Sequence, residues 1–323
     1  MKRRHRLSGL LLASWLGAGC GAHPAPSATG PPSAGPSAPT LVPKAVRIGD
    51  VELHYEELGT GVPVVFVHGG VDDYRSFEPQ LEPLARSYRA ITYSRRHNFP
   101  NVQAALSAGY SAIVDADDLA GLLDSLGARP AHLVGHSYGA YAVLILALKH
   151  PELVRSIVLV EPPLMRWLPD LPGGRELYDD FMKAMWEPAG RAFTKGDPEQ
   201  AMRVTINWFG KNGYVLAGQP ARWDTLPAEV RAFIMENSAE WHALTTSSDA
   251  FPIVDRAAVT AIHVPVLLMS GEKSLKVNQL VDAELARLLP AAEAVTIAGA
   301  THEMWAEKPD ECRERALAFF AKH

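Results

Sequence analysis

Residues 131–148, AHLVGHSYGAYAVLILAL, join two apolar runs through the pentapeptide GHSYG at positions 135–139. The first run has the length of a buried strand, and the second continues without charge or helix breaker, as a buried helix would. A G-x-S-x-G sequence between a strand and a helix is typical of a sharp turn that lifts the serine hydroxyl to the strand's end. The sequence therefore predicts Ser137 as a nucleophile, flanked by Gly135 and Gly139 because the turn is too tight for larger residues.

The composition describes a globular chain of moderate charge. Its 323 residues are 47% hydrophobic, and 31 basic residues stand against 36 acidic ones. This length allows one large α/β domain or two smaller ones, with ample apolar residues for a core. No basic footprint is present, which argues against nucleic acid as a partner. The two cysteines, Cys20 and Cys312, are too few for a disulfide framework and wrongly spaced for a metal site, so we expect no metal and no organic cofactor.

The first forty residues are not expected to belong to the folded domain. Residues 2–6 are mostly basic, residues 7–16 form an apolar run too short to cross a bilayer, and small residues precede Cys20. Residues 1–20 are therefore predicted to be a secretory signal peptide, which resembles a bacterial lipobox with Cys20 as the acylated residue. Residues 21–43 are rich in Pro, Ala, Ser and Gly and predict a tether. We expect an exported lipoprotein of the cell envelope, or otherwise a periplasmic or secreted protein.

Residues 44–323 show strands and helices in alternation. Strands are predicted at residues 45–48, 51–56, 62–67, 89–93, 131–134, 156–160, 266–269 and 294–297. Helices are predicted at about residues 72–87, 112–126, 140–148 and 309–320. This order predicts an α/β fold with a mostly parallel sheet of eight strands and helices on both faces. Between about residues 162 and 257 helical patterns take over, which predicts a helical cap inserted after the sixth strand.

Aromatic residues concentrate in this insertion. Five of the six tryptophans beyond the leader fall there, namely Trp167, Trp186, Trp208, Trp223 and Trp241. Each one alone is better explained as a core residue. Together they favour an apolar pocket for a small-molecule substrate with an acyl or aromatic group.

Four charged residues near the third and fourth predicted strands are interpreted as structural. Asp72 and Asp73 are expected to cap the helix that follows rather than to bind a metal. Arg95 and Arg96 are expected to form ion pairs within the fold rather than to meet an anionic substrate.

Three short motifs, in this order, resemble the α/β-hydrolase fold superfamily. They are HGG at residues 68–70 after the third strand, the pentapeptide GHSYG, and GATH at residues 299–302 near the end. The resemblance covers residues 45–323, and residues 68–101 are also similar to a subgroup of small capped esterase-like hydrolases. It implies a serine, histidine and acid triad at the carboxyl edge of the sheet.

The base of this triad is expected to be His302. A free hydroxyl is a poor nucleophile at neutral pH, so the serine needs a base beside it. His302 follows the last strand, on the loop where the resemblance places that base. His263 precedes its strand and so lies at the wrong edge, while His242 falls in the cap.

The acid has two candidates. The commonest family pattern places it after the strand at residues 266–269, but the sequence there reads GEKS, with a serine at the expected position 274. Glu161 ends the strand after the serine turn and resembles the alternative placement known in some capped members, such as haloalkane dehalogenases. A carboxylate there is costly to bury without a partner, and His302 would supply one. Glu161 is therefore the predicted acid and Glu272 the alternative, with a structural salt bridge to the cap as a further interpretation of Glu161.

The resemblance also implies the groups that stabilise an oxyanion. Two backbone N–H groups are expected to donate to it, that of Tyr138 next to the nucleophile and that of Gly70 after the third strand. The predicted function is hydrolysis of a carboxylic ester through an acyl-enzyme, with Ser137, His302 and Glu161 as the triad.

Other reactions and one non-catalytic role stay open. The same triad serves C–C hydrolases, thioesterases, lactonases and perhydrolases. A tethered binding protein is the remaining alternative, in which Ser274 would mark a decayed triad. The sequence identifies neither the substrate nor the oligomeric state.

Overall fold

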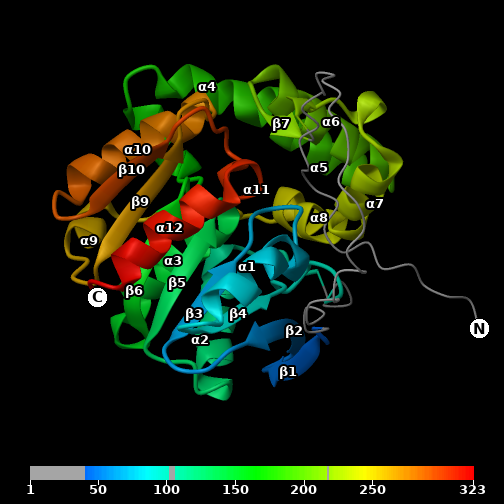
Figure 1. Ribbon diagram of the computed structural model, residues 1–323. Helices are drawn as coiled ribbons and strands as arrows, with labels where there is room; N and C mark the ends of the chain where they lie inside the picture. The colour runs from blue at the N-terminus through cyan, green and yellow to red at the C-terminus, as the bar shows by residue number, and fades with distance from the viewer. Residues whose placement is uncertain (1–40, 102–105, 217) are drawn as a thin grey trace, which may run out of the picture.

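The computed structural model describes residues 41–101, 106–216 and 218–323. Its main sheet has eight strands in the order β1-β2-β4-β3-β5-β6-β9-β10 (Figure 1). The strands are β1 (Lys44–Ile48), β2 (Val51–Leu58), β3 (Pro63–Val67), β4 (Arg89–Tyr93), β5 (Ala131–His136), β6 (Val154–Val160), β9 (Val266–Gly271) and β10 (Glu293–Ile297). Strand β2 pairs antiparallel with β1 and β4, and every pairing from β4 to β10 is parallel. The predicted mostly parallel sheet is confirmed.

Helices cover both faces of this sheet. The helices outside the insertion are α1 (Glu78–Leu84), α2 (Ala112–Ser125), α3 (Tyr138–Lys149), α9 (Arg256–Thr260), α10 (Lys276–Leu288), α11 (Met304–Glu307) and α12 (Pro309–Phe320). Because side chains alternate along a strand, Val65 and Leu133 enter one core with α2, α3 and α10. Val64 and Val134 enter a second core with α1 and α12. The central strands are therefore apolar on both sides, as their continuous apolar sequences predict.

The insertion between β6 and β9 contains helices and one short hairpin. Its elements are α4 (Gly174–Asp180), a π-helical stretch (Phe181–Trp186), α5 (Glu187–Thr194), α6 (Pro198–Lys211), the two-residue strands β7 (Val215–Leu216) and β8 (Gln219–Pro220), α7 (Ala228–Glu236) and α8 (Ser238–Thr246). In Figure 1 its helices, coloured green to yellow, lie along the top and right of the view, with α4 next to α10. We call residues 162–257 the cap segment. The Asp197 side chain accepts from Gln200 N at 3.0 Å and so caps the start of α6.

Two helices differ from the predicted ones, and two charged residues have the expected structural roles. The helix expected at residues 72–87 is a 3₁₀ turn (Tyr74–Ser76) followed by the shorter α1. The Asp73 side chain caps that turn by accepting from Arg75 N at 3.0 Å, and Arg96 pairs with Asp118 at 2.8 Å, so both residues are structural as expected. Helix α10 was not predicted, although its buried Val277 and Leu285 show helical spacing.

The leader falls outside this description. The predicted signal peptide, Cys20 and residues 21–40 of the tether lie outside the described residues. Within the part of the chain that the structure describes, no helix is both long enough and apolar enough to span a bilayer.

Candidate active site

Strand β5 delivers Ser137 to a sharp turn before α3. Ser137 has φ 52° and ψ −121°, a conformation that non-glycine residues rarely adopt. Its N–H donates to Val160 O at 2.8 Å, which ties the turn to the end of β6. A Cβ at Gly135 would lie 2.5 Å from Ala140 Cα, and one at Gly139 would lie 2.2 Å from a carbonyl oxygen of β3. Both flanking glycines are therefore required by space, as the pentapeptide predicts.

Backbone strain concentrates at one edge of the sheet. Among the described non-glycine residues, positive φ angles occur at Val71 (57°), Ser137 (52°) and Glu161 (52°). These residues follow β3, β5 and β6, which are neighbouring strands, so all three lie where the parallel strands end. Such conformations cost about 1–3 kcal/mol each and gather at functional sites. The strained positions therefore mark this edge as the candidate site.

Glu161 and His302, 141 residues apart in the sequence, form a buried pair at this edge. His302 Nδ1 lies 2.5 Å from Glu161 Oε2, and the Glu161 side chain is 0% exposed. Gly271 N donates to Oε1 at 2.8 Å, Asn278 Nδ2 donates to Oε2 at 2.9 Å, and the Ser274 hydroxyl also donates to Oε2. Both carboxylate oxygens are thus hydrogen-bonded, which is what a buried carboxylate requires.

The pair fixes the charges on both groups. Burial alone would raise the pKa of Glu161, but hydrogen bonding and charge from His302 outweigh it and hold that pKa below its usual value of 4.5. Burial would lower the pKa of His302, but Glu161 raises it above its usual 6.5. Burial and the Glu161 charge raise the pKa of Asp282 on α10 to about 8. At neutral pH Asp282 is therefore protonated and Glu161 carries the negative charge.

The alternative acid, Glu272, has a different position. Its side chain is exposed, and its Oε2 accepts from Gly299 N at 2.6 Å. Ser274, at the position where the common pattern expects the acid, is buried and donates to Glu161. The sequence did not identify Ser274 or Asn278 as site residues. The available signal was a serine and an amide four residues apart, with Ser274 just before α10 and Asn278 in its first turn.

Loop contacts bring His302 close to the serine turn. The rings of His136 and His302 lie with their centroids 4.6 Å apart, and His136 Nε2 is 3.0 Å from His302 O. Ser137, the next residue, is bound through its backbone to the end of β6, directly before Glu161. The three predicted residues Ser137, Glu161 and His302 therefore meet at one edge of the sheet.

The loop of residues 68–70 lies between the serine turn and the cap segment. A Cβ at Gly69 would be 3.2 Å from Ser137 Cβ, and one at Gly70 would be 2.8 Å from Trp241 Cζ3. Tyr138 begins α3, so its backbone N–H is one of the free donors at that helix's N-terminus. Gly69 thus packs against Ser137, and Tyr138, which carries the other expected N–H donor, follows Ser137 directly in the chain.

Aromatic side chains of the cap segment continue from this loop. The Trp241 ring lies 5.3 Å from Trp186, Trp186 lies 4.7 Å from Phe251, and Phe251 lies 6.2 Å from Tyr138. We call these four residues the aromatic wall. The other tryptophans of the cap segment are buried and donate to structural partners, Trp167 to Val254 O, Trp208 to Asp180 and Trp223 to Glu199. All five tryptophans of the cap segment are buried in one core, and two of them lie along the aromatic wall.

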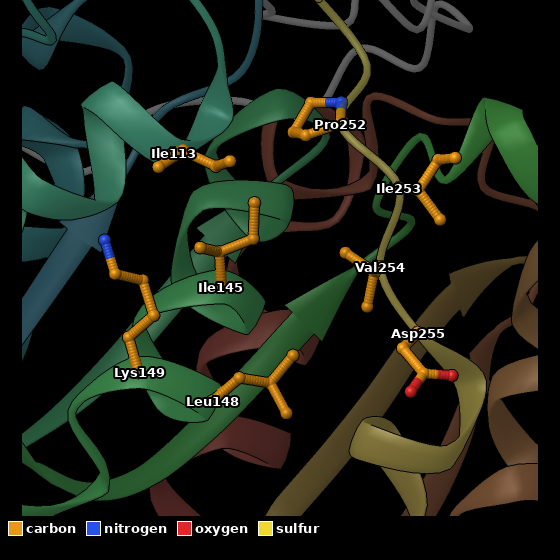
Figure 2. Close-up of a pocket in the computed structure, with 8 residues that line it drawn as sticks. All are labelled: Ile113, Ile145, Leu148, Lys149, Pro252, Ile253, Val254 and Asp255. Carbon is orange, nitrogen blue, oxygen red and sulfur yellow. The ribbon is translucent and has the colours of Figure 1, made fainter.

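A shallow apolar groove lies elsewhere on the molecule. Figure 2 shows it between α2, α3 and residues 252–255, with Ile113, Ile145 and Ile253 among its lining side chains. None of the residues predicted for the site lines this groove. Its position therefore gives no support to a role in the chemistry at Ser137.

One group among the described residues has the side chains and spacing of a metal site. The ligand atoms of His136, His302 and Glu303 lie within 4.8 Å of one another. His136 Nε2 and His302 Nδ1 are already engaged by His302 O and Glu161, and Glu303 accepts from the Tyr214 hydroxyl. These side chains are thus held by hydrogen bonds within the protein.

The family of the chain follows from comparison with known proteins. A model of the alpha/beta hydrolase family matches residues 64–315, so the chain belongs to this family and is an α/β-hydrolase. A 2-(acetamidomethylene)succinate hydrolase from Mesorhizobium japonicum is 29% identical over 269 residues, covering 81% of this chain and 89% of the relative. A putative carbamate hydrolase, RutD, from Azorhizobium caulinodans is 27% identical over 280 residues, covering 84% and 96%.

Solved structures agree on the fold. A thermophilic esterase from Thermogutta terrifontis matches with a TM-score of 0.68 at 22% sequence identity, covering 88% of this chain and 99% of its own. At that identity the likeness shows the fold alone. The family model confirms the predicted superfamily, and the solved structures agree with the predicted fold.

Proposed function

We propose that the protein is a serine hydrolase that cleaves a carboxylic ester through an acyl-enzyme. The observation that carries this proposal is the buried Glu161–His302 pair, 2.5 Å apart, at the edge of the sheet that presents Ser137. Such a pair activates a serine, because Glu161 holds the proton on Nδ1 and leaves Nε2 free to accept another. The acid is a glutamate after β6, and Ser274 supports it instead of marking a decayed triad.

The proposed reaction has two halves. Ser137 Oγ attacks the ester carbonyl while His302 takes its proton, and the tetrahedral intermediate collapses as His302 gives that proton to the departing alcohol. Water then attacks the acyl-enzyme, again with His302 as base, and releases the acid. The Gly70 and Tyr138 N–H groups stabilise the oxyanion in both halves.

The proposed substrate is an ester whose acyl group is apolar or aromatic. The aromatic wall runs from Trp241 beside the loop at residues 68–70 to Tyr138 next to the nucleophile, which favours apolar contact near the reacting carbonyl. The two relatives are named for a succinate derivative and a carbamate, so these classes must be compared with esters.

Labelling and a substrate panel test the proposal. A fluorophosphonate probe is expected to label the folded wild-type protein. The kcat/KM values for p-nitrophenyl butyrate and octanoate are expected to exceed the value for the acetate by about tenfold or more, because each buried CH₂ contributes about 0.8 kcal/mol. Diketone, thioester, lactone, carbamate and peracid-forming substrates are measured alongside. Folded protein that is not labelled would favour a binding protein, and a higher kcat/KM for another class would identify one of the alternative reactions.

The pH profile tests the electrostatics of His302. The base must be neutral to accept a proton, and Glu161 raises its pKa above 6.5. We therefore expect kcat/KM to fall as the pH drops through a midpoint above 6.5. In Glu161→Gln the charge is lost while burial remains, so the midpoint of the residual activity moves down. A wild-type midpoint below 6.5 would contradict the pairing.

We also propose that the protein is exported and anchored through an acylated Cys20. The support is the leader sequence itself, with its basic start, short apolar run and small residues before the cysteine. A Pro-rich tether of about twenty residues would hold the enzyme roughly 60 Å from a membrane surface. Full-length protein is expected in the detergent phase of a Triton X-114 partition, and Cys20→Ser in the aqueous phase. Equal partitioning of the two would exclude the anchor.

A further inference from the structure

Arg95 is a fully buried cation that joins the sheet to the cap segment. It follows β4, and its side chain is 0% exposed, as are those of its two acidic partners. Its Nη1 lies 2.6 Å from Asp115 Oδ2 on α2, and its Nη2 pairs with Glu240 Oε1 on α8 of the cap segment. Burying three charges is expensive, and replacement by apolar residues often stabilises a protein. A contribution to folding stability alone therefore does not explain why these three charges are buried together.

The same guanidinium holds the loop that carries Gly70. Arg95 Nη2 donates to Gly69 O at 2.8 Å, and Arg95 Nε donates to His68 O at 3.2 Å. The His68 ring fixes the loop further, since its Nε2 accepts from Arg95 N at 3.0 Å and its Nδ1 lies 2.8 Å from Gly69 O. In a planar trans peptide the carbonyl and the next N–H point in opposite directions. Turning Gly69 O toward Arg95 therefore turns the Gly70 N–H away from it.

Glu240 holds the following residue of the loop. Its Oε2 accepts from Val71 N at 2.7 Å and from Asn98 Nδ2 at 3.1 Å, while its Oε1 pairs with Arg95. Val71 has φ 57°, which a β-branched residue adopts only where its surroundings hold it. One carboxylate from the cap segment thus constrains the loop on the far side of Gly70.

The cluster lies near both residues that carry the proposed oxyanion donors. The Arg95 guanidinium carbon lies 5.2 Å from the Tyr138 ring centroid, and Trp241, next to Glu240, contacts the Gly70 position. Gly69 in turn approaches Ser137. A rotation of the Gly69–Gly70 peptide would therefore change the packing against Ser137.

We propose that Arg95 and Glu240 are positioning residues that aim the Gly70 N–H at the oxyanion, so that α8 of the cap segment helps to build the oxyanion hole. This inference rests on the proposed serine hydrolase function. Neither residue touches the reacting atoms; each acts through the peptide between Gly69 and Gly70. The cap segment would then contribute to catalysis itself as well as to substrate binding.

Glu240→Gln is the most direct test, because it keeps the volume but cannot serve both Arg95 and Val71 N with a full charge. We expect kcat to fall by about 10–100-fold, below the loss for deleting an oxyanion donor outright, with KM changed less than about threefold. A trifluoromethyl ketone forms a hemiketal oxyanion with the serine, so its Ki is expected to rise by the same factor as kcat/KM falls. A merely structural role would not produce that proportionality.

A matched control comes from the neighbouring helix. Glu236 on α7 also joins the cap segment to the sheet domain, through Arg75 Nη2 at 2.9 Å, but its side chain is 46% exposed. Glu236→Gln is expected to change kcat by less than about twofold. If Glu240→Gln does not fold, Asn98→Ala removes one of the hydrogen bonds to the Glu240 carboxylate and is expected to lower kcat by about 3–10-fold with the same rise in ketone Ki.

The outcomes separate this inference from the function on which it rests. Active wild-type enzyme with unchanged kcat or unchanged ketone Ki in folded Glu240→Gln would overturn the positioning role alone. A rise in KM with unchanged kcat would do the same, because it would assign Glu240 to substrate binding. Wild-type protein that no fluorophosphonate labels at Ser137 would overturn the proposed function and this inference together.

Discussion

Ser137→Ala is expected to lower kcat for the best ester by about 10⁴–10⁶-fold and to abolish labelling by a fluorophosphonate. The hydroxyl is the proposed nucleophile, and it lies at the turn between β5 and α3. A small residual rate is expected to survive, since binding and the oxyanion donors remain. Single-turnover mass spectrometry of the wild type should show the acyl adduct on the peptide that contains Ser137.

Control measurements separate chemistry from folding. Ser87 is exposed and lies before β4, so Ser87→Ala is a matched serine variant that should keep wild-type kcat and labelling. Circular dichroism and thermal melting should show both variants folded. Residual activity of Ser137→Ala above one-tenth of wild type, in folded protein, would exclude Ser137 as the nucleophile.

Glu161→Gln is expected to lower kcat by about 10³–10⁴-fold with little change in fold. The amide keeps the shape of the side chain but loses the charge that stabilises protonated His302, to which Oε2 lies at 2.5 Å. Its NH2 group would also face either Gly271 N or the Ser274 hydroxyl, each of which now donates to the carboxylate, so the imidazole is held less well and in a mixture of tautomers. Stopped-flow or steady-state kinetics with the best ester measure the loss of kcat.

Glu272→Gln, at the alternative acid after β9, supplies the comparison. Its carboxylate is exposed and accepts from Gly299 N, and charge-assisted bonds at such positions are weak, so kcat should fall by less than about threefold. The comparison that identifies the acid is the loss of kcat in Glu161→Gln against the loss in Glu272→Gln. A larger loss in Glu272→Gln than in Glu161→Gln would assign the acid to the loop after β9.

Ser274 and Asn278 show why the acid could be suggested but not established from the sequence. A serine at the usual acid position is equally compatible with a decayed triad and with a displaced acid. In the structure the Ser274 hydroxyl and Asn278 Nδ2 both donate to Glu161, which makes the buried carboxylate acceptable at that position. The helix that carries Asn278 is not predicted from the sequence, so no local pattern placed either side chain beside Glu161.

For Arg95 as well, the sequence predicts only part of what the structure shows. Arg95 was interpreted as a structural ion-pair residue, and its pairs with Asp115 and Glu240 agree with that. Its bonds to the carbonyls of the loop at residues 68–70 had no counterpart in the sequence pattern. The tertiary structure is therefore what connects a routine ion pair to the proposed oxyanion hole.

The sequence by itself determined the eight strands, the strained serine turn, the helical insertion and the choice of His302, because periodicity, glycine spacing and position after a strand are properties of short segments. Only the tertiary structure decided which carboxylate reaches His302, which polar groups support that carboxylate, and which residue of the cap segment holds the loop. Those contacts join residues 141 and 145 positions apart, as in Glu161–His302 and Arg95–Glu240. They depend on how the layers pack and on which buried charges find partners, and no local pattern of residues specifies either.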